Sequence, residues 1–294
     1  MDDRPIWTPD TSGINRLADD LDSDALIAGL RSAFFVRLTF TSISEVISND
    51  DADRRRKLVR VCRLLLSAGD CIDPQHEILG KMVAEFEATP SFDWRKVLVD
   101  FPAAQVAIAR GETFSDDDAR QEREHNEKVK DEFARVYEDA KPHFDRLFSS
   151  GAENPPRNVS ELVARLQIPG GAFWSLAGNL YARVGKKSPD EALMRKFVAE
   201  CDPLRAILVA FVAAQYDLCV RPERVGPSFR SGRNDTMMAI CLPYCRQFVT
   251  NDKGQLACYR AVASVVGLDV TVRSYEEFRN GFSVISAAAG STRR

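Results

Sequence analysis

Short β-forming runs alternate with helical patterns at both ends of this 294-residue chain. Strands that alternate with helices at such spacing pair through right-handed β-α-β connections, which produce a parallel sheet. We therefore expect an α/β fold with a central parallel sheet. The four β-forming runs are residues 4–9 and 34–41 near the N-terminus, and residues 246–250 and 269–274 near the C-terminus.

A third, very short strand is expected at residues 70–73. The helical pattern before it ends at Gly69, because glycine commonly terminates helices. The pattern after it has Pro74 near its start, where proline is tolerated. The expected helices around these strands are residues 12–33, 42–50, 51–69, 74–88, 234–245, 253–267 and 275–282.

Strand signals almost vanish between about residue 90 and residue 225. Segments 116–148 and 190–220 have the periodicity of long helices joined by turns that contain Pro and Gly. Two separate α/β lobes are an alternative, but each half alone has too few strands to cover both faces of a stable sheet. We therefore predict one discontinuous domain, residues 1–90 plus 226–294, interrupted by a mostly α-helical insertion, residues 91–225.

Composition places the chain among folded soluble proteins. Hydrophobic residues make up 45% and charged residues 28%, which leaves little room for extensive disorder. No uninterrupted apolar run approaches the roughly 20 residues that span a bilayer. The N-terminal residues 1–10 lack the basic and apolar regions of a signal peptide. A cytoplasmic location without a membrane partner is expected.

The seven cysteines are odd in number and lie mostly inside apolar segments, which suits reduced, buried thiols. Cys241 and Cys245 are four residues apart, but no second Cys or His pair lies nearby in the sequence. This spacing argues against a structural zinc site.

Carboxylates stand where strands are expected to end. Asp10 follows the first β-forming run, and Asp252 follows the run at 246–250. Glu45 lies on the first turn of the helix after the second run, and Asp235 lies at the start of the helix expected at 234–245. Each Asp has a simpler explanation as a helix N-cap. Because functional groups gather at the carboxyl ends of parallel strands, we expect all four acids to share one edge of the sheet.

Four acids at one edge would raise one another's pKa and destabilise the fold unless a cation neutralised them. Hard divalent ions are suited to such a set, since Mg²⁺ and Mn²⁺ prefer carboxylate and water oxygens. The pattern therefore predicts a Mg²⁺ or Mn²⁺ site.

The motifs around these acids resemble those of PIN-domain (VapC-like) ribonucleases. The resemblance covers roughly residues 4–87 and 228–280, and its most specific piece is a helix leading into a buried strand that ends in Thr-x-Asp, here Thr250-Asn251-Asp252. It implies a three-layer α/β/α PIN-like domain, with the helical insertion as a departure from the usual length. The segments that carry it are DTSGINRL, SISEVI, NDTMMAICLPYCRQFVTND and VTVRSYEEF.

The resemblance implies a metal-dependent endoribonuclease, a hydrolase that cuts phosphodiester bonds of single-stranded RNA. Asp10, Glu45, Asp235 and Asp252 would be both the catalytic residues and the metal ligands. Their supporting residues would be Thr11, Ser12, Thr250 and Asn251, for which helix capping is the simpler explanation. A toxin-like role, a cognate inhibitor or antitoxin protein, and a homodimer are compatible with this resemblance.

A net charge of -3 provides no overall attraction to RNA, so local basic residues must contact the phosphates. The candidates are Arg230, Arg233 and Lys253, which flank Asp235 and Asp252. The basic run Arg54–Lys57 is either a solvated helix face or an RNA contact, and the charged run Asp116–Asp131 favours a solvated helix face.

Two other functions use the same pattern differently. A catalytically silent PIN-like module would bind a protein partner through its helical insertion, and a DNase would use the same acids on another substrate. A phosphatase of the haloacid dehalogenase type is excluded, because it needs a second Asp where Ser12 stands.

Overall fold

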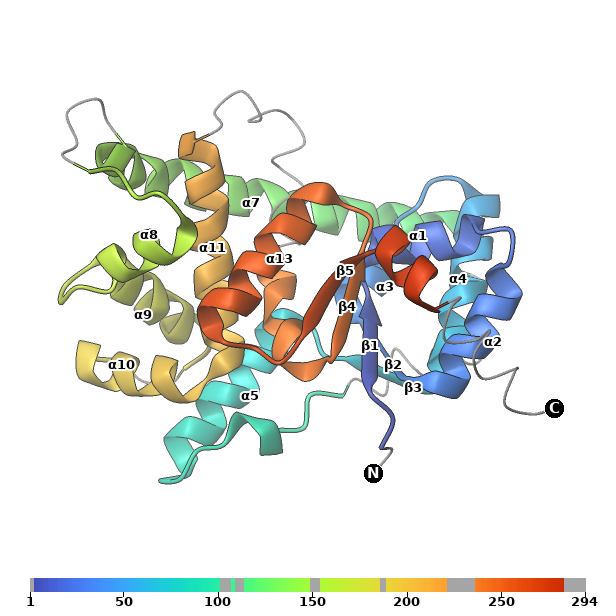
Figure 1. Ribbon diagram of the computed structural model, residues 1–294, viewed down its shortest axis with the longest axis horizontal. Coiled ribbons are helices and arrows are strands. Elements are labelled where there is room, and N and C mark those ends of the chain that lie inside the picture. Colours follow the sequence, from blue (N-terminus) through green and yellow to red (C-terminus); the bar gives the residue numbers. More distant parts are fainter. Residues whose placement is uncertain are drawn as a thin grey trace.

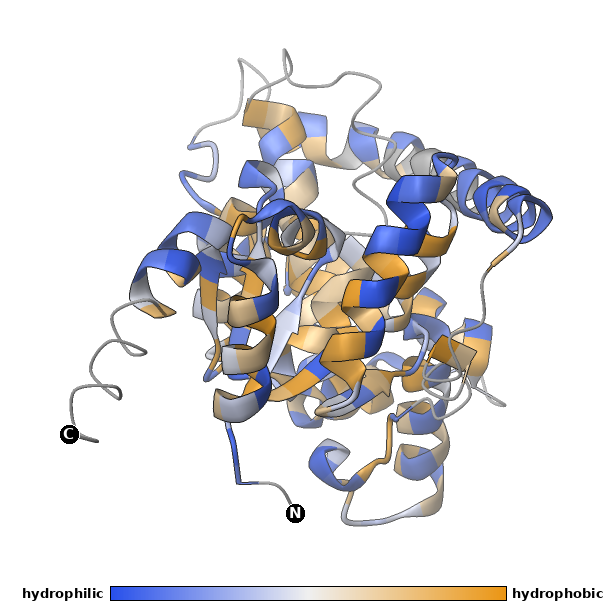
Figure 2. Cartoon of the chain, turned by 90° about the vertical axis from the view of Figure 1, so that its right-hand side faces the viewer, coloured by the Kyte–Doolittle hydropathy of each residue, from blue (hydrophilic) through white to orange (hydrophobic). Residues whose placement is uncertain are grey.

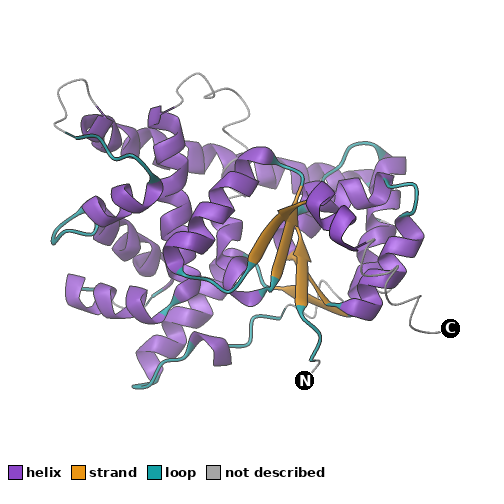
Figure 3. Ribbon diagram, in the orientation of Figure 1, coloured by secondary structure: helices purple, strands orange, loops and turns teal. Residues whose placement is uncertain are grey.

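A computed structural model describes residues 3–100, 107–108, 114–148, 154–185, 189–220 and 236–282. Its centre is a five-stranded parallel sheet with the order β3-β2-β1-β4-β5 (Figures 1 and 3). The prediction of an α/β fold with a parallel sheet is confirmed. The strands are β1 (Ile6–Pro9), β2 (Phe35–Thr39), β3 (Gly69–Ile72), β4 (Gln247–Thr250) and β5 (Thr271–Ser274).

The two ends of the chain meet at the middle of this sheet. Strand β1 pairs with β4 in parallel, with Thr8 opposite Phe248 and Pro9 opposite Val249. The backbone N–H of Asp10 extends the pairing by donating to the Val249 carbonyl at 3.0 Å. One sheet is therefore built from both termini, and the alternative of two separate α/β lobes is wrong.

Helices cover both faces of the sheet (Figure 1), and the alternation of side chains along each strand explains why. Phe248 and Ile72 belong to one hydrophobic cluster, whereas their neighbours Val249 and Cys71 belong to the other. Successive side chains of a strand point to opposite faces, so each strand contributes to two apolar layers. Hydrophobic residues concentrate where helices meet the sheet, and hydrophilic residues face outward (Figure 2).

One face is covered by N-terminal helices together with the helical residues 275–282. These helices are α1 (Thr11–Asp19), α2 (Ser23–Ala33), α3 (Phe40–Ile47) and α4 (Ala52–Leu66). The cluster on the other face draws on the remaining elements: α5 (Gln75–Ala88), η1 (Trp94–Lys96), α7 (Asp116–Phe148), α8 (Val159–Leu166), α9 (Ala172–Val184), α10 (Glu191–Glu200), α11 (Asp202–Val220), η4 (Ala239–Tyr244) and α13 (Lys253–Val266).

Helices of segment 91–225 therefore share a hydrophobic cluster with strands of the sheet. Helix α7 extends behind the sheet from α11 to α3, and it contacts both (Figure 1). On the α11 side, the Phe144 and Phe211 rings lie 6.3 Å apart. The domain limits 1–90 plus 226–294 and 91–225 stay a prediction, but this segment packs against the sheet layer.

Helix α11 is long and apolar enough to cross a membrane by length and composition, yet 67% of its most apolar window is buried inside the protein. Asp202, Arg205 and Asp217 interrupt its apolar residues. A helix that is apolar nearly all round and packs against η4, α13, α7 and α8 is a core helix.

Several expected elements differ in their limits. The helix expected at 42–50 begins earlier, at Phe40, so Glu45 lies in its second turn and not at its start. The pattern at 12–33 forms two helices, because the backbone of Asp20 is extended after α1. Gly69 does not terminate α4; it begins β3, where an added Cβ would lie 1.6 Å from the Val36 carbonyl oxygen. In the helix expected at 234–245, residues 236–238 are α-helical and are followed by the 3₁₀-helix η4. This 3₁₀-helix contains Pro243, which has no backbone N–H to donate.

Candidate functional site

The carboxyl ends of β1 and β4 lie side by side at the centre of the sheet. After β1 the chain continues toward β2 on one side, and after β4 it continues toward β5 on the other. Such a reversal of strand order opens a crevice at the carboxyl ends, where α/β proteins bind ligands. Asp10 directly follows β1, and Asp252 lies two positions after the end of β4.

The Asp10 carboxylate is buried, with 4% of the residue exposed. Its Oδ1 accepts a hydrogen bond from the Gly13 N–H at 2.6 Å, as the N-cap of α1. The Ser12 hydroxyl lies 2.9 Å from Oδ1 and 2.8 Å from Oδ2, and the Thr250 hydroxyl donates to Oδ2 at 2.7 Å. Three donors therefore hold this carboxylate in one orientation.

The same two hydroxyls connect the turns after β1 and β4. Ser12 Oγ accepts from the Asn251 N–H at 2.6 Å, and Thr250 Oγ1 accepts from the Asp252 N–H at 3.0 Å. Each hydroxyl thus donates its proton to Asp10 and accepts from the backbone after β4. We refer to Asp10, Ser12, Thr250 and the N–H groups of Asn251 and Asp252 as the β1–β4 latch.

Burial raises the pKa of Asp10 from 3.8 to about 6, because desolvation disfavours the charged form. Hydrogen bonds from Gly13, Thr250 and Ser12 lower this pKa, and the nearby charge of Glu45 raises it. Desolvation has the largest effect. A buried acid that titrates close to neutral pH is typical of functional sites.

Glu45 reaches the same edge from α3. Its Oε2 accepts a hydrogen bond from the hydroxyl of Thr11, the residue that follows Asp10. Glu45 is half-buried, and its charge acts on Asp10. The expectation that Glu45 lies on the first turn of this helix is wrong, because α3 starts five residues earlier, at Phe40; the role of Glu45 as a metal ligand stays a prediction.

Asp252 is exposed and caps α13, where its Oδ1 accepts from the Gln255 N–H at 2.8 Å. Asp10 and Asp252 are therefore both helix N-caps, which is the simpler explanation for an Asp at the end of a strand. Asp252 Oδ2 accepts no hydrogen bond from the described residues. Asn251 contributes to the latch through its backbone N–H, and Lys253 is exposed at the first position of α13.

Asp235, Arg230 and Arg233 lie outside the described residues. Within the described ranges, no group of three or more His, Cys, Asp or Glu side chains lies close enough together to hold a metal ion. The structure brings Asp10, Glu45 and Asp252 to one edge without packing them into such a group.

Two acids at this edge were not among the expected site residues. Asp73 directly follows β3, is 5% exposed and pairs with Lys81. The strand-then-Asp pattern that identified Asp10 also occurs at Asp73 and could have found it. Glu122 of α7 accepts from the Ser44 hydroxyl, next to Glu45, and no signal in the sequence links these two helices.

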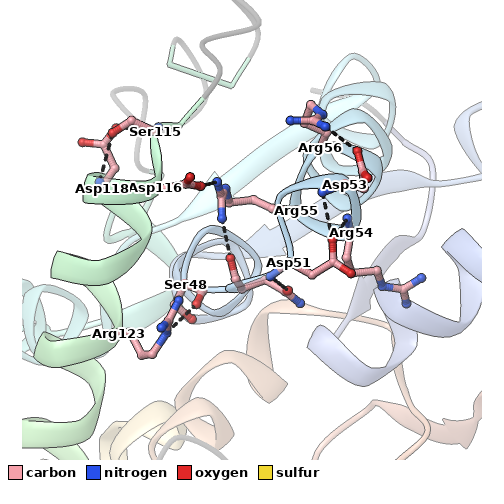
Figure 4. A network of polar contacts seen from close by, with 11 residues as sticks. Ser48, Asp51, Asp53, Arg54, Arg55, Arg56, Ser115, Asp116, Asp118 and Arg123 are labelled. Atoms are coloured by element: carbon pink, nitrogen blue, oxygen red, sulfur yellow. Dashed lines mark hydrogen bonds and ion pairs between the residues drawn. The ribbon is translucent and has the colours of Figure 1, made fainter.

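All four residues of the basic run Arg54–Lys57 form ion pairs with acidic side chains. Figure 4 shows the pairs of Arg55 with Asp116 and of Arg56 with Asp53. Arg54 and Lys57 pair with Asp19 of α1, and Arg56 pairs with Asp53. These pairs favour the structural explanation over an RNA contact. The charged run of α7 is also partly structural, because Asp116 pairs with the buried Arg55.

No protein-family model, curated protein or solved structure was found to match this chain. The chemistry of this edge therefore has to be inferred from its own side chains.

Proposed function

We propose that this protein is a Mg²⁺- or Mn²⁺-dependent endoribonuclease of the PIN type, which hydrolyses single-stranded RNA at the edge where β1 and β4 end. The supporting observation is that Thr250 links the Asp10 carboxylate to the backbone of Asp252, while Thr11, the neighbour of Asp10, donates to Glu45. These acids come from residues near opposite ends of the chain.

The donor set suits a hard cation, because it offers carboxylate and hydroxyl oxygens. A carboxylate has about four lone-pair sites, and Asp10 uses three for Gly13, Ser12 and Thr250, which leaves one for an ion or its water. Oδ2 of Asp252 is also available to bind an ion. The described acids do not form a complete metal site, so the proposal includes Asp235 as the fourth ligand.

A bound divalent ion would lower the pKa of a water molecule and stabilise charge on the scissile phosphate. The protein's own residues prepare this edge. The latch fixes the Asp10 carboxylate, and the Thr11 hydroxyl orients Glu45. Lys253, together with Arg230 and Arg233, would attract the phosphates of the substrate.

Cleavage of a labelled single-stranded RNA by the purified full-length protein tests the proposal, with Mn²⁺, with Mg²⁺ and with EDTA. Asp10→Asn and Asp252→Asn are each expected to lower the rate at least about 100-fold, since both remove a proposed metal ligand. Asp24→Asn is the matched control, an exposed acid on α2 that pairs with Arg60. Unchanged cleavage in both site variants would rule out this function.

A second candidate is a catalytically silent module that binds a protein partner. It is favoured by the latch itself, which gives Asp10 a structural role without metal. A silent module should melt at the same temperature with and without Mn²⁺, whereas a metal site should stabilise the fold. A matched single-stranded DNA in the cleavage assay separates a DNase from a ribonuclease.

The biological setting is part of the same proposal. We infer action on cytoplasmic RNA, with an antitoxin-like inhibitor and a homodimer as further partners. Growth arrest on expression, relieved by Asp10→Asn, would support the toxin-like role, whereas normal growth with high expression of the active protein would contradict it.

A further inference from the structure

A pocket of about 560 Å³ is lined by residues of helices α7, α8, α9 and α11. Figure 1 shows these four helices. Its volume falls within the roughly 300–1,000 Å³ that is usual for small-molecule sites. The start of the helix at Thr236 completes the wall. Asp10, Glu45 and Asp252, the three described acids of the proposed nuclease site, do not line it.

The inner wall of this pocket is apolar. Phe144, Phe173 and Phe211 come from α7, α9 and α11, and each is at most 5% exposed. Leu176 and Leu180 of α9 extend the wall toward the surface and are half-buried. Such a surface binds water weakly and favours an apolar occupant.

The rim of the pocket is polar on one side. Ser175, Asn179 and Arg183 follow one another at intervals of four residues along α9, so they form one stripe, and all three are exposed. Arg183 is the only charged residue among the described lining residues. It forms no ion pair with any described residue, in contrast to Arg195 of α10, which pairs with Glu191.

We propose that this pocket binds a single-chain amphiphile with an anionic head, such as a medium-chain fatty carboxylate. The aliphatic chain would lie against the three phenylalanines, and the carboxylate would meet the Arg183 guanidinium. Ser175 and Asn179 supply neutral hydrogen-bond donors beside it. The proposal does not depend on the roles given to Asp10, Glu45 and Asp252 in the nuclease site.

Calorimetric titration of the full-length protein with dodecanoate, below its micelle concentration, tests this proposal. A Kd on the order of 10 μM is expected from the size of the ligand. Dodecyltrimethylammonium, which has a similar chain and a positive head, should bind at least about 10-fold more weakly. Equal binding of the two amphiphiles, or no binding of dodecanoate, would overturn the proposal.

Two variants locate the site. Arg183→Gln should weaken dodecanoate binding about 10-fold and leave binding of neutral dodecanol unchanged, with Arg165→Gln on the exposed part of α8 as the control. Ala172→Phe, at an exposed lining position, should narrow the pocket and weaken both ligands. Wild-type affinity in both variants would show binding elsewhere and refute the site.

Discussion

Thr250, the last residue of β4, donates a hydrogen bond of 2.7 Å to the carboxylate of Asp10, a residue 240 positions earlier in the chain. Thr250 is fully buried, and its hydroxyl also accepts from the Asp252 N–H. A single hydroxyl group therefore links the Asp10 carboxylate to the backbone of Asp252. This contact is both a structural latch and the arrangement on which the proposed chemistry depends.

Removing this hydroxyl should destabilise the fold. Thr250→Val keeps the shape of the side chain but removes one of the three donors to the Asp10 carboxylate and leaves the Asp252 N–H without its partner, so the free energy of unfolding should fall by about 1–3 kcal/mol. Urea denaturation at pH 7 measures the change. Thr250→Ser restores the hydroxyl and should recover most of the loss; equal losses in both variants would show that packing dominates.

The stability of the metal-free protein should depend on pH through Asp10. Its pKa is about 6 in the folded state and 3.8 as the ordinary value, so the folded state binds more protons between these values. The free energy of unfolding should therefore decrease as pH rises from about 4 to 6, by roughly 3 kcal/mol, and level off above pH 7.

Urea denaturation in EDTA from pH 4.5 to 7.5 tests this slope. Asp19, whose hydrogen bond with Arg54 lowers its pKa to about 2, titrates below this window. Asp10→Asn removes the titrating group, so its free energy of unfolding should change less with pH over the same window. An identical slope in the wild type and in Asp10→Asn would show that another group is responsible.

Two glycines should respond in opposite directions to alanine. At Gly13 an added Cβ would lie 2.9 Å from the Val249 carbonyl oxygen and 3.1 Å from Asp10 Oδ1, so Gly13→Ala should cost about 1–3 kcal/mol. Gly80 lies inside α5 with nothing within 4 Å of the added atom, so Gly80→Ala should stabilise by about 0.5–1 kcal/mol. Thermal melting of the two variants measures both effects.

The adjacent residues Arg55 and Arg56 of α4 should contribute differently to the free energy of unfolding. Arg55 has 5% of its side chain exposed, donates to the Asn49 carbonyl at 2.6 Å and pairs with Asp116 of α7, whereas the Arg56 side chain is 63% exposed (Figure 4). Arg55→Met should therefore lower the free energy of unfolding by about 1–3 kcal/mol, and Arg56→Met by less than about 0.5 kcal/mol. Similar values in urea denaturation would contradict the proposed role of Arg55 as a link between α4 and α7.

Binding of Mn²⁺ to the folded protein should raise its melting temperature. If Mn²⁺ is present at about 100 times its Kd, the melting temperature should rise by roughly 5 °C. Asp252→Asn should remove most of this rise, and Asp24→Asn should not. A rise of equal size in all three proteins would mean that the ion binds elsewhere.

Local chemistry explains what the sequence predicted well. The β-forming runs, the helices between them and the N-cap Asp residues follow from period, propensity and capping, which act over a few residues. The pattern also indicated that the two ends share a parallel sheet, since neither half had enough strands. Phe248 and Val249 alternate between the two hydrophobic layers as period-two geometry requires.

The tertiary structure decided which distant groups meet. No local signal pairs Thr250 with Asp10, Thr11 with Glu45, or Glu122 with Ser44, because these contacts depend on strand order and on where α7 packs. Only the fold shows that Gly69 must lack a side chain, since the Val36 carbonyl occupies that space. The sequence determined which acids end strands, and the folded chain determined how closely they approach one another, because their separation is set by packing over the whole sheet.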